Sequence, residues 1–130
     1  MSLSDTTADR LETATVSAHL ATAAENRPHV APVWFLYDDG HLYAFTGGRK
    51  LANLRENPRV AASIEDEEWH AVLQGTASVV EDEERIEEVG QRLFEKYTGG
   101  APADEYSDSD GTPQGTLIEI SIGTATVRDN

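Results

Sequence analysis

Short segments with the residue pattern of β-strands, separated by turn residues, dominate this chain. The clearest pair is residues 29–37 (HVAPVWFLY) and 41–46 (HLYAFT), which Asp38-Asp39-Gly40 joins. β-Branched and aromatic residues favour strands, and an aspartate–glycine turn favours a hairpin. Because neighbouring strands lie close together in the chain, the pattern favours a mostly antiparallel barrel over a parallel α/β sheet. The further strands that it predicts are 19–23, 59–64, 69–80 and 116–127.

Two residues inside these strands restrict how they pair. Pro32 has no N–H to donate to a neighbouring strand, so we expect it at a bulge or at a sheet edge. Gly75 interrupts residues 69–80 and predicts a bend there.

Three helices are predicted around and between the strands. A short one contains Leu11 and begins near a cap at Asp5 or Thr6. Residues 49–57 form the second, which Pro58 ends. Residues 83–97 give the strongest pattern, because their apolar residues recur at helical spacing. The chain of 130 residues is then one domain, with residues 1–7 frayed and residues 101–115 forming a long acidic loop.

The charge balance excludes one class of partner. The chain has 24 acidic and 10 basic residues, for a net charge of −14. Nucleic-acid binding needs a basic face, so it is not expected. Acidic residues spread along the chain are typical of proteins from salt-rich cells, where counterions screen self-repulsion. We therefore expect a halophilic source, the alternative being an acidic protein of ordinary salt.

Several kinds of chemistry are missing from the sequence. It contains no cysteine, which excludes disulfides and thiolate metal sites. The four histidines show no metal-binding spacing, and no metal site is expected. No apolar run is long enough for a membrane span or a signal peptide, so the expected location is the cytoplasm.

One turn has the parts of an anion site. Gly47-Gly48-Arg49-Lys50 passes directly into the helix predicted at 49–57. Glycines let a ligand approach the backbone, the first helical N–H groups are free, and two cations stand beside them. The alternative is that the two cations belong to an ordinary solvated surface.

The order of these segments resembles a known family. PHVAPVWFLYDDGHLYAFTGG is followed by RKLANLRENPRVAASI, by WHAVLQGTASVV and by an acidic amphipathic helix. This series is similar to the pyridoxamine 5′-phosphate oxidase-like, FMN-binding split-barrel family. The resemblance implies a mostly β, antiparallel split barrel with flanking α-helices. It also implies a homodimer with a flavin in the groove between the subunits.

The resemblance assigns roles to particular residues. Arg49 and Lys50 match the pair that holds the flavin 5′-phosphate, and Asn53 either joins them or caps local backbone. His70 matches a position that reaches the flavin from the partner strand. The strand before the turn borders the flavin ring, and the end of the next strand flanks the ribityl phosphate. The residues of these two strands are His29, Val30, Pro32, Val33, Trp34, Phe45 and Thr46.

Each of these assignments has a structural alternative. Val33 and Phe45 are also typical core residues, Trp34 is a typical interface aromatic, and His70 is equally compatible with an ordinary surface histidine. Trp34 and Phe35 are adjacent, so strand alternation turns one of them outward.

The expected function is that of an FMN-dependent oxidoreductase with a small-molecule acceptor. Its alternatives are a reductase that uses the phosphate-bearing 8-hydroxy-5-deazaflavin coenzyme, and a flavin- or haem-binding module without turnover. Residues 101–115 are expected to shape the substrate pocket. Authentic pyridoxamine phosphate oxidation is not favoured, because Arg128 is the only basic residue after Lys96.

Overall fold

The computed structural model describes residues 3–99 and 115–130. Its helices are α1 (Asp5–Thr13), α2 (Gly48–Glu56) and α3 (Glu83–Thr98). Its strands are β1 (Ala18–Ala24), β2 (Arg27–Val33), β3 (Leu36–Asp38), β4 (His41–Thr46), β5 (Arg59–Glu65), β6 (Trp69–Val79) and β7 (Thr116–Asp129). The loop predicted at 101–115 lies outside the described residues, apart from Gly115.

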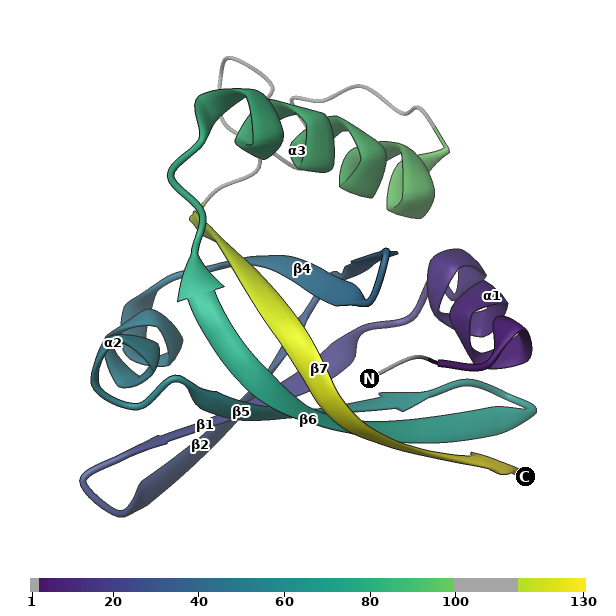
Figure 1. The fold of residues 1–130 in the computed structure, drawn as a ribbon, viewed down its shortest axis with the longest axis horizontal. Coiled ribbons are helices and arrows are strands. Elements are labelled where there is room, and N and C mark those ends of the chain that lie inside the picture. The colour runs from purple at the N-terminus through teal and green to yellow at the C-terminus, as the bar shows by residue number, and fades with distance from the viewer. Residues whose placement is uncertain (1–2, 100–114) are drawn as a thin grey trace.

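The strands form one antiparallel sheet that curls into a split barrel (Figure 1). Its seven strands follow the order β2-β1-β5-β6-β7-β4-β3, which places β2 and β3 at opposite edges. Only Trp34 and Phe35 separate these two strands in the chain. A flat sheet of this size is about 29 Å wide, whereas the link from Val33 to Leu36 reaches about 11 Å at most. The sheet must therefore curl until its edges approach each other.

The hairpin predicted across residues 29–46 is confirmed only at its turn. β3 pairs with β4, with Asp38 opposite His41. The segment predicted as a single first arm is instead two strands, and β2 pairs with β1, so that Ala24 lies opposite Arg27. The turn between β1 and β2 is tight because Glu25 and Asn26 both adopt positive φ, as a two-residue hairpin loop requires.

The expected interruptions have clear structural places. Pro32 lies on β2, an edge strand of the sheet, where its missing N–H leaves no internal ladder broken. The register between β6 and β7 shifts between Gln74 and Gly75. A Cβ at Gly75 would collide with the carbonyl oxygen of Ser121, so this bulge requires glycine.

The helices begin and end close to their expected positions, with one difference at the first. Ser4, rather than Asp5 or Thr6, caps α1 by accepting a hydrogen bond from the Thr7 N–H. Helix α1 therefore starts within residues 1–7, for which the composition predicts fraying. Asp82 caps α3, and Gly99 ends it in the left-handed conformation.

The buried side chains form two clusters. The larger fills the barrel and contains the fully buried Phe35, Leu20, Ile64 and Ile118. The smaller, which includes Leu93, packs the inner face of α3 against β3, β4 and the start of β7. Helix α3 thus covers one end of the barrel, while α2 lies beside the β1–β2 hairpin at another part of the sheet (Figure 1).

Candidate functional site

The start of α2 has the backbone that an anion site needs. Gly48 has φ +57°, a conformation that favours glycine, and Gly47 before it offers no side chain to cap the helix. The first N–H groups of a helix have no intrahelical acceptor. Thr46 immediately before the turn is 3% exposed, and its hydroxyl has no partner in the part of the chain that the structure describes. Unpaired hydrogen-bond donors therefore gather at the start of α2, beside Arg49.

A pocket of about 450 Å³ lies between the β1–β2 hairpin and one face of α2. Arg49 and Asn53 line it from the helix, and Arg27 and His29 line it from β2. Positions 49 and 53 are one turn apart and share a helix face. The Nδ1 atom of His29 is buried without a partner among the described residues. The pocket is also lined by Ala24, Glu25, Pro28, Ala52 and Glu56.

Asn53 anchors the helix that carries this site. Its side chain is 5% exposed, and Nδ2 donates a hydrogen bond of 3.1 Å to the hydroxyl of Thr22 on β1. The bond joins α2 to the sheet between two buried groups, which keeps both of them satisfied. Asn53 therefore positions Arg49 beside the β1–β2 hairpin.

Arg27 is a residue of this pocket that sequence reasoning missed. It is the first residue of β2 and follows the tight turn at Glu25 and Asn26. Nothing in its local pattern distinguishes it from an ordinary exposed turn arginine. Its proximity to Arg49 depends on the pairing of β1 with β2 and on the packing of α2, which are contacts between distant parts of the chain.

Lys50 lies apart from Arg49 in the structure. It is half-buried and does not line the pocket that Arg49 lines. Adjacent residues on a helix project about 100° apart, because a turn contains 3.6 residues. The two cations therefore flank the start of α2 on different faces.

Val30, Pro32 and His70 share the outer face of the sheet. Strand register places Val30, Ala21, Ala61, Gln74 and Thr124 in one row across this face. The next row contains Pro32, His19, Ser63, Val72 and Thr126. His70 follows along β6, opposite Glu65, and its Nδ1 lies 2.8 Å from the Asn130 side-chain oxygen.

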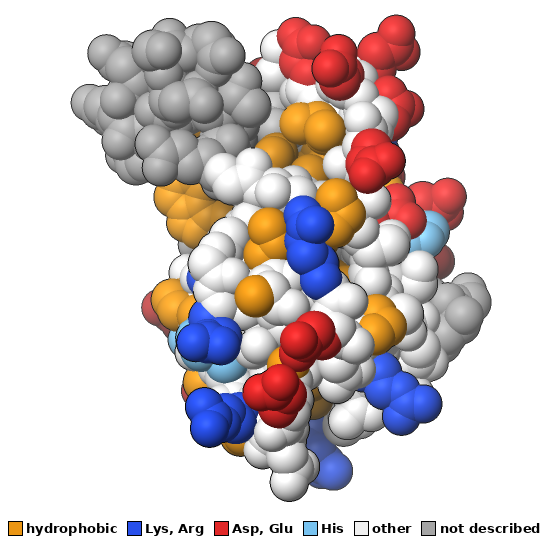
Figure 2. All heavy atoms as spheres, turned by 90° about the vertical axis from the view of Figure 1, so that its left-hand side faces the viewer, with side chains coloured by type: hydrophobic (Ala, Val, Ile, Leu, Met, Phe, Trp, Pro, Cys, Tyr) orange, Lys and Arg blue, Asp and Glu red, His pale blue; other side chains and the backbone are white. Residues whose placement is uncertain are grey.

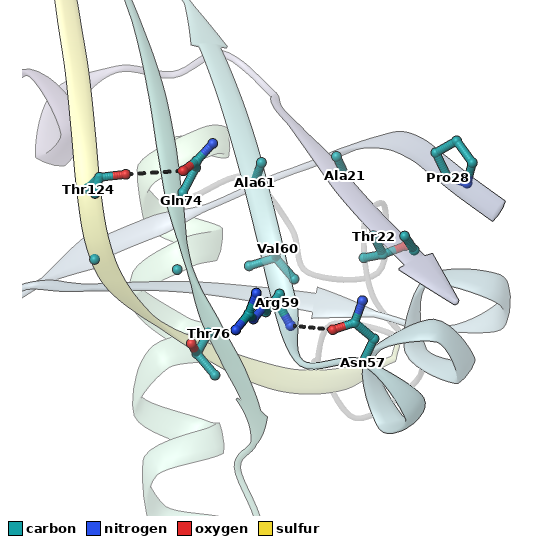
Figure 3. Close-up of a pocket in the computed structure, with 13 residues that line it drawn as sticks. Ala21, Thr22, Pro28, Asn57, Arg59, Val60, Ala61, Gln74, Thr76 and Thr124 are labelled. Atoms are coloured by element: carbon teal, nitrogen blue, oxygen red, sulfur yellow. Dashed lines mark hydrogen bonds between the residues drawn. The ribbon is translucent and has the colours of Figure 1, made fainter. Parts of the chain in front are cut away.

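A shallow hollow of about 560 Å³ lies in this outer face. Figure 3 shows its small residues Ala21 and Ala61, and Gln74 bonded to Thr124. Arg59 is the only charged residue among those that line it. Pro28 borders this hollow and also the pocket beside α2, so the two cavities meet at the β1–β2 hairpin. His70 lies four residues along β6 from Gln74 at the hollow, which is about 13 Å of strand.

The remaining candidates lie on the inner side. Val33 is buried in the barrel core. Trp34 stacks on Tyr97 of α3, and Phe45 packs against the smaller cluster that α3 covers. Of the adjacent pair Trp34 and Phe35, Phe35 is the fully buried one. Within one chain, the structure therefore brings His29, Arg49 and Asn53 together and leaves Trp34 and His70 elsewhere.

Two other kinds of site are absent from the described residues, 3–99 and 115–130. No three histidine or acidic side chains there come close enough together to hold a metal ion. Nor does any described helix combine the length and apolar character needed to cross a membrane.

A comparison with family models shows which protein family has this architecture. The model described as pyridoxamine 5′-phosphate oxidase matches residues 4–128, nearly the whole chain. The chain belongs to the pyridoxamine 5′-phosphate oxidase family. The match confirms the resemblance, which covers about residues 19–97, and extends it through β7. Curated proteins, by contrast, include no match to this chain in sequence.

Solved structures show how widely the family's fold is shared. A conserved hypothetical protein of Mycobacterium tuberculosis superimposes with a TM-score of 0.80 at 24% identity, over 99% of this chain and 86% of that one. A protein of Mesorhizobium loti described as FAD-binding gives 0.72 at 24% identity, over 98% and 96%. A structure described as F420 reductase gives 0.69 at 22% identity, over 91% and 94%. At these identities the likeness establishes the split-barrel fold.

Proposed function

We propose that this protein is a homodimeric, FMN-dependent oxidoreductase, with the deazaflavin coenzyme as the alternative cofactor. The observation that carries the proposal is Arg49, the second residue of α2, which lines the pocket without an ion pair among the described residues. In a chain with 24 acids, an arginine left unpaired beside free helical N–H groups is suited to an incoming anion.

The donors present fit a phosphate monoester. Arg49 supplies charge, the first N–H groups of α2 supply neutral donors, and the unpartnered Nδ1 of His29 supplies a further polar contact. Glu25 and Glu56 line the same pocket and oppose an anion there. Neither forms a salt bridge with Arg49 in the described chain, so the guanidinium stays available to the ligand. Lys50 adds positive charge from the adjacent helix face.

The flavin ring is assigned to the outer surface of β2, beside Val30 and Pro32. Val30 is 63% exposed, which is unusual for a large apolar side chain and gives a surface for a planar ring. When bound, the flavin or deazaflavin supplies hydride transfer. The chain fixes the phosphate through Arg49, orients the ring against β2 and excludes water from one of its faces. Trp34, which stacks on Tyr97, supports the end of β2 from within.

A second copy of the chain is assigned to the outer face of the sheet. Strands β1, β2, β5 and β6 together contain one acidic residue, Glu65, of the 24 in the chain. Figure 2 shows many acidic side chains at the top of the molecule, near α3, while its lower half has basic side chains with a few acidic ones between them. Two chains of net charge −14 repel least where this nearly acid-free face meets its copy. In such a dimer His70 of one chain is available to the flavin of the other.

The names of the structural neighbours agree with this class of cofactor. One is described as FAD-binding and another as an F420 reductase, F420 being a deazaflavin coenzyme. FMN remains the first choice because the pocket and the start of α2 account for one phosphate on a ribityl chain. A flavin- or haem-binding module without turnover is the competing hypothesis.

The test begins with purified protein reconstituted separately with FMN, the deazaflavin coenzyme and haem in molar salt. Absorption spectra after gel filtration identify which one stays bound. The loaded protein is then reduced with nicotinamide donors and reoxidised with a panel of quinones and nitroaromatics. Reoxidation faster than that of free cofactor supports the oxidoreductase. Bound flavin that reoxidises no faster with every acceptor supports the binding module, and stable binding of haem alone contradicts both flavin assignments.

A further inference from the structure

The contacts of Asn130 determine the orientation of its side-chain amide. Its Nδ2 lies 3.2 Å from the carbonyl oxygen of Asp66 and 3.3 Å from that of Glu67, in the turn between β5 and β6. Its backbone N–H donates to the carbonyl of Glu68 at 2.9 Å, in the same turn. A carbonyl oxygen accepts and never donates, so these two carbonyls require the amide nitrogen on their side. The amide oxygen of Asn130 therefore points away from the turn.

That amide oxygen determines which nitrogen of His70 carries the hydrogen. It lies 2.8 Å from Nδ1 of His70, and an amide oxygen can only accept. Nδ1 therefore carries a hydrogen and donates it to Asn130. A neutral imidazole has one N–H, so its Nε2 keeps a lone pair and is an acceptor. Free histidine in water favours the other tautomer, so Asn130 reverses the ordinary preference.

The surroundings of His70 leave Nε2 open. His70 lies on the outer face of the sheet, between Glu65 on β5 and Arg128 on β7. These two neighbours have opposite charges, so neither sign dominates beside the ring. Within residues 3–99 and 115–130, the ring makes its one hydrogen bond through Nδ1, to Asn130. Nε2 is thus available to a donor on whatever molecule covers this face.

We propose that Asn130 is a positioning residue, which holds His70 in the Nδ1–H tautomer so that Nε2 accepts a hydrogen bond from the flavin ring bound by the partner subunit. This inference rests on the proposed function, in which the outer face of the sheet meets a second copy of the chain. An oxidised isoalloxazine ring has a single N–H, at N3, and so has the oxidised deazaflavin ring. N3–H is therefore the group that suits Nε2 with either cofactor. His70 touches the ring, whereas Asn130 acts through His70.

The first test measures the tautomer in cofactor-free protein. Proton–nitrogen correlation spectra distinguish a ring nitrogen that carries hydrogen from one with a free lone pair, and His70→Gln identifies the signals of His70. Wild-type protein is compared with Asn130→Ala over a pH titration that extends to the plateau of the neutral ring. Asp66→Ala is the matched control, because it removes the carboxylate that accepts from the Glu67 N–H and so loosens the same turn without touching His70.

We expect the hydrogen on Nδ1 in wild-type protein and in Asp66→Ala, and mainly on Nε2 in Asn130→Ala. A wild-type ring with its hydrogen on Nε2 overturns the inference, and so does an Asn130→Ala variant whose His70 signals are unchanged. Either result leaves the proposed function untouched, because no cofactor takes part in this measurement.

The second test measures whether the tautomer matters to the bound ring. FMN, or the deazaflavin coenzyme if that alone is retained, is compared with its N3-methyl derivative by fluorescence titration in molar salt. Asn130→Ala should weaken the unmodified cofactor by about 2- to 10-fold, the effect of one net hydrogen bond, and leave the N3-methyl derivative unchanged. In a His70→Ala background the same change should leave both constants unchanged, because the two residues act as one unit.

Two results of these titrations overturn the inference while the cofactor still binds and the proposed function stands. An equal loss for the cofactor and its N3-methyl derivative shows that N3–H is not the donor. A loss that persists in the His70→Ala background shows that Asn130 acts through the turn rather than through His70. Failure of wild-type protein to bind any flavin or deazaflavin overturns the proposed function, and the role of Nε2 falls with it.

Discussion

The indole of Trp34 lies face to face with the phenol ring of Tyr97, with ring centroids 4.6 Å apart and planes inclined by 5°. The same tyrosine hydroxyl donates to the carbonyl of Val16 at 2.8 Å and accepts from the N–H of Phe35 at 3.1 Å. One residue of α3 therefore holds the link between β2 and β3, the two edges of the split barrel.

Removing that hydroxyl is expected to destabilise the fold. Tyr97→Phe keeps the stacking but leaves the part-buried Phe35 N–H and Val16 carbonyl without this partner, which costs about 1–3 kcal/mol. Urea denaturation in molar salt measures the change. Tyr37→Phe is the control, because its hydroxyl accepts a single bond, from Gly40 N–H at 3.2 Å, and its loss should cost less. Equal effects of the two variants would contradict the role of Tyr97.

Stability should also depend on alkaline pH through two neighbouring residues. Burial lowers the pKa of Lys96 from 10.5 to about 8, while its ammonium donates to the carbonyls of Leu11 and Phe35. The unfolded chain then binds more protons between pH 8 and 10.5, so this lysine makes the free energy of unfolding rise with pH across that range. Burial also raises the pKa of Tyr97 from 10 to about 12. Its contribution to stability is present below pH 10 and is lost above it.

We therefore expect stability in urea titrations to rise from pH 8 to 10, to reach its maximum between pH 10 and 10.5, and to fall at higher pH. Lys96→Met removes the rising limb and keeps the falling one. A variant that retains the whole rise would show that another group causes it.

Stability should also depend on acidic pH, through Asp38. Its carboxylate joins the β3–β4 hairpin to α3 by binding Arg85 and Arg92. The hydrogen bond from Arg85, aided by Arg92, lowers the pKa of Asp38 below its usual 3.8. The stability that Asp38 contributes is present above that value and is lost as the pH falls through the lower, folded one. Asp38→Asn should flatten the acid limb of stability against pH. Asp39→Asn, next in the chain and without an ion pair in the described structure, should leave it unchanged, and an equal effect would refute the assignment.

The account of the dimer predicts a specific disruption. Val72 is 41% exposed in the middle of the nearly acid-free outer face. Val72→Glu adds a charge to both copies of that face, so light scattering should show a monomer, and the flavin should bind more weakly. Val79→Glu, at the far end of the same strand, is the control and should remain dimeric.

The wild-type dimer should itself loosen at low salt, because screening of 14 net negative charges per chain is lost. A wild-type monomer in molar salt with flavin bound would contradict an intersubunit site.

The sequence predicts local features of this fold well and long-range ones less so. The turn at Gly40, the bend at Gly75 and the α3 pattern depend on neighbouring residues, and all three are present. The prediction of the strand that pairs with β2 was wrong, because an alternating pattern indicates a strand but does not specify its neighbour. The break of the predicted arm at Trp34 follows from the contacts of Tyr97, 62 residues from Phe35 in the chain.

The residues of the candidate site also differ in whether local sequence could predict them. The glycine turn and Arg49 could be found from local spacing, and helical periodicity also separates Lys50 from the face of Arg49 and Asn53. Arg27 could not be found, because only the packing of α2 beside the β1–β2 hairpin brings it to Arg49. The roles of Trp34 and His70 toward a flavin stay predictions, since one lies under α3 and the other lies on the outer face.

Phosphate recognition by Arg49 and Lys50 is the central claim, and paired titrations with FMN and riboflavin test it most directly. Wild-type protein should bind FMN far more tightly than riboflavin. Arg49→Ala should weaken FMN by about 10- to 100-fold, the equivalent of about 1.5–3 kcal/mol for one charge-assisted contact. Lys50→Ala should weaken FMN by less, because Lys50 does not line the pocket, and both variants should leave riboflavin unchanged. Arg55→Ala on the same helix should change neither constant. Equal affinity of the wild-type protein for FMN and riboflavin, or equal losses for both ligands in the two variants, would contradict the account.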